Sequence, residues 1–156
     1  MKNESERIAD QLKRAFDGEA WHGPALKEAL AGVTAEQAVA KPIAGAHSIW
    51  ELVAHIAGWE GVVARRLNGE AISEPAEGDF PAPPAHPSAA AWGDLLSKVY
   101  ASHDQLVAHM AALTEADLRK RIADKPYPAW LMAHGTVGHA LYHVGQIVML
   151  KRALGH

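Results

Sequence analysis

The chain has 156 residues, of which 49% are hydrophobic and 21% are charged, and its formal net charge is −3. This composition is typical of one globular domain spanning 1–156, and the absence of a long Lys/Arg run argues against a nucleic-acid-binding module. The chain has no cysteine, which excludes disulfides, thiolate zinc sites and a cysteine nucleophile; any metal ion must therefore be bound by histidine or carboxylate side chains.

The first 40 residues predict helical segments separated by breaks. Apolar residues four apart predict a helix over 4–16. Gly23 and Pro24 interrupt the pattern, and a second helical piece follows, so we expect one bent helix or two collinear helices. Thr34 begins a capping-box pattern that predicts a short helical turn.

A long helix is predicted from Ser48 to about Leu67. Ser48 and Glu51 form a second capping-box pattern, and Asn68-Gly69 marks the end of the helix. His55 lies on the flank of the apolar face of this helix. That face consists of Ile49, Leu52, Val53, Ile56, Trp59 and Val63.

Residues 68–87 contain five prolines and two glycines, which exclude regular structure. A connection of this length in a small domain is usually a crossover or a lid. Ser88 then caps a third helix, and a short turn follows at Thr114. The third helix has a heptad-like apolar seam of Trp92, Leu96, Val99, His103, Leu106, Met110 and Leu113.

The last predicted helix runs from about Ala129 to Leu154, and Gly155 stops it. No strand pattern is present, so the fold class predicted from the residues is all-α, with four main helices and one long connection. A weak internal repeat accompanies this pattern. Shifting the chain by 80 residues places Thr34 on Thr114 and Trp50 on Trp130.

His139 and His143 are four residues apart on the last helix, so their rings share one face about a turn apart. This spacing allows two imidazole nitrogens to bind one metal ion. Thr136, Gln146 and Ile147 lie near the same face, which indicates that it points inward. The alternative is a pair of core histidines that hydrogen-bond to backbone carbonyls or water.

A metal site would need at least one further ligand from another helix. His55 and His103 both face the predicted core, and periodicity does not choose between them, although it favours burial of His103. His134 lies about 140° around the helix from His139 and cannot easily share its metal. His22 could reach the mouth of a site, but no pattern supports a role for it.

The residues at particular positions exclude two other kinds of metal site. The last helix contains no Glu, which excludes a di-iron carboxylate bundle. Residue 140 is Ala, so the His-Glu-x-x-His pattern of zinc proteases is absent. Gln146 follows His143 by three residues and could orient a ligand from outside the metal shell.

Residues 48–60, 139–147 and 151–155 together resemble the DinB-like superfamily, which includes YfiT-type metal-dependent hydrolases. The resemblance implies a four-helix bundle of up-down-down-up order, which suits the long connection over 68–87. It also implies a divalent metal ion held by His55, His139 and His143, with His103 outside the ligand set. Zinc or nickel is the first expectation, with iron, cobalt or manganese as alternatives. Homodimers are common in this superfamily and are expected here.

Three functions fit such a site, and the resemblance implies the first two. The first is an enzyme whose metal activates a low-molecular-weight thiol for transfer to a small-molecule electrophile. The second is a hydrolase whose metal activates water. It needs a nearby base, and Glu60 lies one turn beyond His55 but at a different angle around the helix. The third is a non-catalytic protein whose metal ion stabilises the bundle. The polar N-terminus and the absence of a transmembrane-length stretch predict a cytoplasmic protein with no membrane partner.

Overall fold

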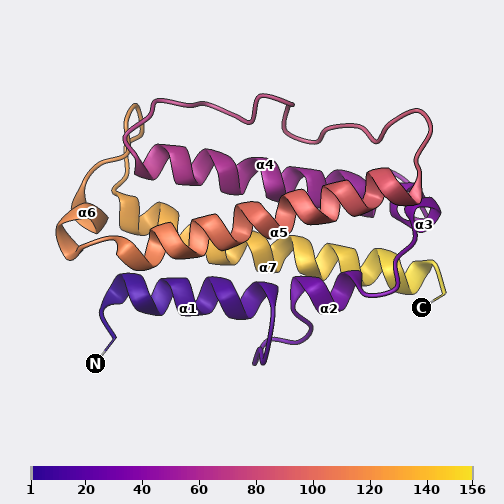
Figure 1. Ribbon diagram of the computed structural model, residues 1–156, viewed down its shortest axis with the longest axis horizontal. Coiled ribbons are helices and arrows are strands. Elements are labelled where there is room, and N and C mark those ends of the chain that lie inside the picture. Colours follow the sequence, from indigo (N-terminus) through magenta and orange to yellow (C-terminus); the bar gives the residue numbers. More distant parts are fainter. Residues whose placement is uncertain (1, 156) are drawn as a thin grey trace.

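Seven α-helices form the part of the chain, residues 2–155, that the computed structural model describes (Figure 1). Their bounds are α1 Glu4–Phe16, α2 Leu26–Leu30, α3 Ala35–Val39, α4 Ile49–Leu67, α5 Ala89–Ala112, α6 Glu115–Arg119 and α7 Ala129–Ala153. Within residues 2–155 there is no strand, only an isolated bridge between Arg121 and Pro128. The all-α prediction is confirmed.

Local side-chain chemistry accounts for where the helices begin. The Ser48 hydroxyl accepts the backbone N–H of Glu51, while the Glu51 carboxylate accepts that of Ser48. Thr34 and Thr114 make the same reciprocal pair at α3 and α6, and Ser88 caps α5 through its side chain. Each cap satisfies backbone donors that the first helical turn leaves unpaired.

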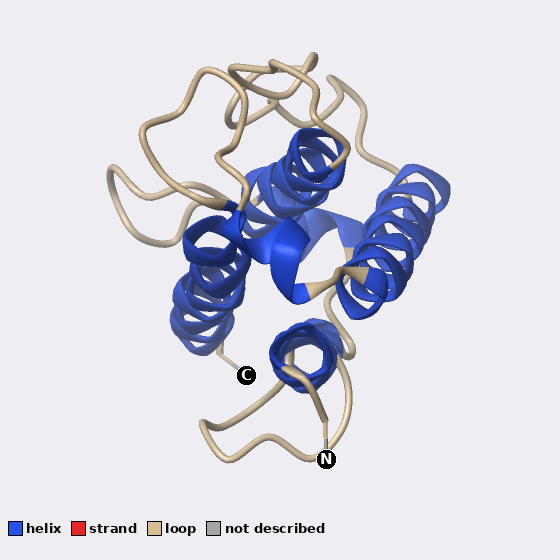
Figure 2. Ribbon diagram, turned by 90° about the vertical axis from the view of Figure 1, so that its left-hand side faces the viewer, coloured by secondary structure: helices blue, strands red, loops and turns tan. Residues whose placement is uncertain are grey.

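The four longest helices, α1, α4, α5 and α7, pack around a common core, which Figure 2 shows nearly end-on. Helix α5 contacts α1 and α4, and α7 contacts the same two helices from the other side. In Figure 1, α1 and α7 run in one direction and α4 and α5 in the other. The connection over 68–88 returns along the outside of α4 and allows α4 and α5 to run in the same direction.

Two clusters of buried apolar side chains occupy the interior. Ile56, Val99 and Ile147 are in the cluster nearer the α7 C-terminus, and Leu12 and Leu106 are in the other. Burying each such side chain contributes about 1.5–3 kcal/mol. Val99, Leu106 and Met110 of the seam predicted along α5 are fully buried in these clusters. Among the described residues, no helix has both the length and the hydropathy needed to cross a bilayer.

The predicted breaks and the offset of 80 both have counterparts in the structure. Helices α1 and α2 lie end to end in Figure 1, in agreement with the collinear alternative. The short helices α3 and α6 begin 80 residues apart, and so do the long helices α4 and α7 that follow them. The long helices that follow each short turn, α4 and α7, face one another, and the candidate site lies between them.

Candidate metal centre

Helices α4 and α7 bring three histidine rings together in the interior. The Nε2 of His139 lies 2.8 Å from the Nε2 of His55 and 3.1 Å from the Nε2 of His143. His55 and His143 are buried, and His139 is partly exposed. Three ligands at about 2.0–2.1 Å from a tetrahedral ion would be about 3.3 Å from one another, close to these separations.

In His55 and His143, a hydrogen bond on the side of the ring away from the cluster determines which ring nitrogen is free to bind a metal ion. The Nδ1 of His55 donates to the backbone carbonyl of Asp79 at 2.7 Å, and the Nδ1 of His143 donates to Oε1 of Gln146 at 2.6 Å. Because carbonyl oxygens only accept, each Nδ1 carries its hydrogen and a neutral ring leaves the Nε2 lone pair available. This is the usual outer arrangement of metal-binding histidines.

Burial favours the uncharged form of two of these rings, those of His139 and His143. It lowers the pKa of His139 to about 4, with the nearby His143 and His55 rings acting in the same direction. Burial also lowers the pKa of His143, although the hydrogen bond to Gln146 opposes the shift. Imidazole rings whose Nε2 atoms converge in this way suit a divalent cation.

The connection between α4 and α5 covers the cluster with an aromatic stack. The ring of Phe80 lies between those of His47 and His55, with centroid separations of 3.7 and 4.0 Å and nearly parallel planes. Beside it, the Asp79 carboxylate accepts the indole N–H of Trp59 at 2.7 Å. The predicted crossover thus contributes two residues to the site, and sequence reasoning missed both because loop residues carry no periodic signal.

His103 is buried as its place in the α5 seam predicts, but it lies outside the cluster. Its ring stacks on Phe16 with centroids 3.8 Å apart, and its Nδ1 is 2.8 Å from Oε1 of Glu60. The other carboxylate oxygen of Glu60 accepts the Ser102 hydroxyl at 3.3 Å. The core position of Glu60 makes it a partner of His103, and its carboxylate is already engaged in these bonds.

Other predicted candidates occupy different surroundings. The Nε2 of His134 bonds an oxygen of Glu4 at 2.9 Å near the surface, and His22 is exposed in the loop between α1 and α2. Gln146 is placed as predicted, outside the three rings, where it orients His143. Trp59 was expected to pack in the core; instead it is partly exposed and holds Asp79.

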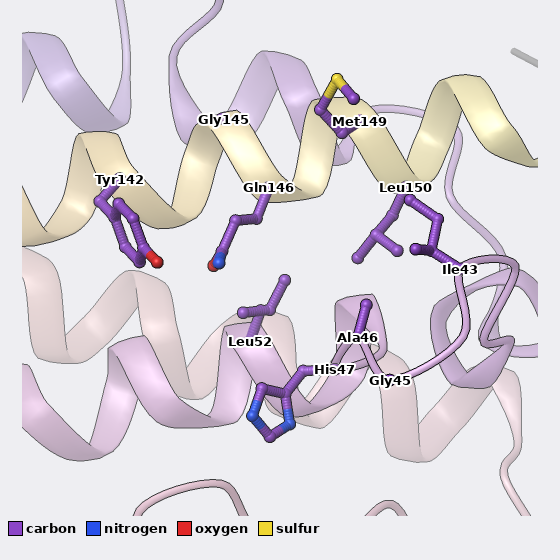
Figure 3. A pocket seen from close by; sticks show the side chains of 10 residues that line it. All are labelled: Ile43, Gly45, Ala46, His47, Leu52, Tyr142, Gly145, Gln146, Met149 and Leu150. Atoms are coloured by element: carbon purple, nitrogen blue, oxygen red, sulfur yellow. The ribbon is translucent and has the colours of Figure 1, made fainter.

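Two cavities flank the three histidines. One, of about 340 Å³, lies between α4 and α7, and both His55 and His139 line it. The other, of about 520 Å³, is lined by Gln146 but by none of the three rings. Figure 3 shows the Gln146 amide and the Tyr142 hydroxyl pointing from α7 into this second space, with Leu52 and His47 opposite. Of these two cavities, the first is the one that rings of the cluster line.

Comparison with known proteins shows which protein family this chain matches. Residues 20–147 match a family model described as "DinB superfamily", and this range includes all three clustered histidines. Neither the curated proteins nor the solved structures yield a match. Because the matched region covers well over half of the 156 residues, this chain belongs to the DinB superfamily.

Proposed function

We propose that this chain binds one divalent metal ion through the Nε2 atoms of His55, His139 and His143. The observation that carries the proposal is the convergence of three Nε2 atoms, two of them on rings whose Nδ1 already donates a hydrogen bond. With Nδ1 of His55 and His143 donating elsewhere, only His139 could supply a hydrogen between the three Nε2 atoms, and a metal ion would engage all three. Zinc or nickel suits three neutral imidazoles best, and iron, cobalt and manganese are the alternatives.

We propose further that the site activates a low-molecular-weight thiol for transfer to an electrophile. A bound divalent ion would supply the positive charge that makes a thiol acidic and nucleophilic near neutral pH. In the reaction, the S–H bond of the thiol would break and its proton would pass to solvent; the sulfur would then form a bond to one carbon of an activated carbon–carbon double bond, whose π electrons would take up a proton from solvent at the neighbouring carbon. The cavity that opens onto His55 and His139 is where both reactants would meet.

The surrounding residues would prepare the site for this chemistry. Asp79 and Gln146 hold two rings in the tautomer that leaves Nε2 free. Phe80 covers one side of His55 and limits the access of water from that side. The apolar walls at Val63 and Met132 would exclude water from a bound thiol.

The two other functions are less well supported. A hydrolase would need a free base, and the Glu60 carboxylate is engaged by His103 and Ser102. A purely structural ion would favour a closed shell of four protein ligands, whereas the three rings adjoin a cavity of about 340 Å³. Both observations favour a site that exchanges small molecules.

Elemental analysis of the purified protein tests metal binding. We expect one equivalent of metal per chain in the wild type and in His134→Ala, which removes a surface histidine. We expect none in His55→Ala or His139→Ala. Cobalt-loaded protein should then develop a sulfur-to-cobalt absorption band when a thiol is added. Absence of metal after reconstitution would contradict the site, and an unchanged cobalt spectrum would contradict thiol activation.

We also propose that the bundle has up-down-down-up order and forms a homodimer through α7. The run directions of the long helices in Figure 1 support the order. Leu131, Tyr142 and Met149 are 46%, 66% and 60% exposed. With Gly138 and Gly145 they form a stripe along α7 whose members are seven, four, three and four residues apart. Light scattering should give twice the chain mass, and Tyr142→Glu should give the monomer mass.

A further inference from the structure

The cavity beside the three histidines is a groove between α4 and α7 that continues past them. On α4, His55, Trp59, Val63 and Arg66 follow one another four, four and three residues apart, which places them on one face. Met132, Thr136 and His139 of α7 line the other side. From His55 to Arg66 the helix rises about 16 Å. The groove therefore has the histidine rings at one end and a guanidinium at the other.

Arg66 is buried, with 6% of its surface exposed, and its partners carry no charge. Its Nε and Nη2 donate to the backbone carbonyls of Ile72 and Ser73 at 2.8 and 2.7 Å. The guanidinium also lies 5.5 Å from the centroid of the Trp59 ring. Within residues 2–155, no carboxylate lies within ion-pair distance of it. A buried cation is normally paired, and the α4 C-terminal dipole compensates only part of its charge.

The two acidic residues that line the groove are engaged elsewhere. Asp79 lies at the histidine end, where it bonds the rings of His55 and Trp59. Glu60 bonds His103 and Ser102 on α5. The groove is thus polarised, with acidic Asp79 beside the histidines and, at Arg66, a positive charge that no carboxylate pairs with. An anionic group entering the groove would be attracted to the Arg66 end.

We propose that this groove binds a small molecule with a carboxylate at one end and an apolar body. The carboxylate pairs with Arg66, the body lies along Val63 and Met132, and the far end reaches His55 and His139. The assignment of the far end as the reacting end rests on the thiol-activating function proposed above. The Arg66 contact rests only on the groove and its charges. The substrate class is therefore a carboxylate-bearing thiol or electrophile.

Isothermal titration with octanoate and with octan-1-ol, which have the same chain length, tests the Arg66 contact. A charge-assisted pair should make octanoate about ten- to a hundredfold tighter in the wild type. Arg66→Met should remove that preference. Arg65→Met, which removes an exposed neighbour paired with Glu70, should keep it. If octanoate affinity is lost in His139→Ala and kept in Arg66→Met, the carboxylate binds at the histidines and the proposal is wrong.

Gly135→Leu provides a test that does not depend on the bonds that Arg66 makes to the connection. Gly135 lines the groove, and a Cβ added there meets no atom within 4 Å, so the helix accepts the side chain. Leu has the higher helix propensity, and the melting temperature should not fall. The added side chain should fill the groove and weaken both octanoate and octan-1-ol. Unchanged affinity for both compounds in this variant would place their binding elsewhere and overturn the proposal.

A second pair of compounds separates this inference from the proposed function. Cobalt-loaded protein is titrated with 8-mercaptooctanoate and with 8-mercaptooctan-1-ol, and the cobalt spectrum is followed. Tighter binding of the acid, lost in Arg66→Met with the cobalt band retained at saturation, supports both proposals. An Arg66-dependent octanoate preference without any cobalt band from either thiol supports the groove and contradicts thiol activation. Cobalt bands of equal affinity for the two thiols support thiol activation and contradict the role of Arg66.

Discussion

The Nδ1 of His143 lies 2.6 Å from the side-chain oxygen of Gln146, less than one turn further along α7. This contact links a ring of the proposed metal site to the cavity on the far side, because Gln146 also lines that cavity. It requires hydrogen on Nδ1 and leaves Nε2 free. The ring is therefore already oriented before any ion binds.

Removing this contact should weaken metal binding. In Gln146→Ala we expect zinc affinity to fall about 10–100-fold, because His143 loses the group that sets its tautomer and angle. Competition with a colorimetric chelator measures the change. Gln105→Ala, on the exposed face of α5, is the matched control and should bind zinc as the wild type does. Equal affinities in the two variants would show that the contact does not prepare the site.

His103→Ala should lower stability and leave metal content unchanged. The substitution removes a fully buried ring and leaves the Glu60 carboxylate without its partner, so the free energy of unfolding should fall by about 3 kcal/mol. Urea titration measures the loss, and elemental analysis measures the metal. Adding Glu60→Gln should recover part of the lost stability, because the two residues interact directly. Loss of metal from folded His103→Ala would contradict the proposed ligand set.

The metal-free protein should lose stability as the pH falls from about 6.5 to about 4. Burial lowers the pKa of His139 from 6.5 to about 4, so between these values the unfolded chain binds more protons than the folded chain. The contribution of His139 is fully present above pH 6.5 and is lost as the pH falls through 4. The pKa of His143 is lowered for the same main reason and acts with the same sign.

Urea titrations at a series of pH values measure this dependence. In His139→Gln the slope between pH 6.5 and 4 should be smaller than in the wild type, because the substituted side chain does not titrate. The pKa values of Asp10 and Asp17 are lowered by their ion pairs with lysine and arginine, so their contributions are lost below this window. Parallel curves for the two proteins would rule out the assigned role of His139.

Phe80→Ala should increase the rate at which the site loses its ion. The ring is stacked between His47 and His55, and each aromatic contact contributes about 0.5–1.5 kcal/mol. Without it, the segment that holds Asp79 against His55 should open more often. Transfer of zinc to excess chelator, followed by stopped-flow absorbance, measures the rate. Ile72→Ala, in the same connection, keeps its backbone bond to Arg66 and should transfer zinc at the wild-type rate.

Local chemistry made much of the fold predictable. Ser48, Thr34 and Thr114 signalled their helix starts because each satisfies backbone donors within four residues of itself. Gly69 and Gly155 ended helices with positive φ values of 90° and 92°, which only glycine adopts without strain. The His139–His143 pair could also be predicted from local sequence, because helical spacing alone places both rings on one face.

The choice of the third histidine needed more than periodicity. His55 and His103 are both buried, and periodicity reports only that a side chain faces the interior. The resemblance favoured His55, and the structure places its Nε2 against His139 while His103 stacks on Phe16 of α1. The two histidines differ in the helix that each side chain faces, which is α7 for His55 and α1 for His103.

By itself, the sequence determined the helical segments, their ends and the shared face of His139 and His143, because these depend on contacts within a few residues. The family resemblance pointed to His55, which periodicity could not select, and the tertiary structure placed its ring in the cluster. Only the tertiary structure decided that Asp79 and Phe80 enclose the cluster. It also decided that Arg66 lies in the same groove as the histidines. These relationships join residues 24 or more positions apart, or depend on how two helices face each other, and no local spacing encodes them.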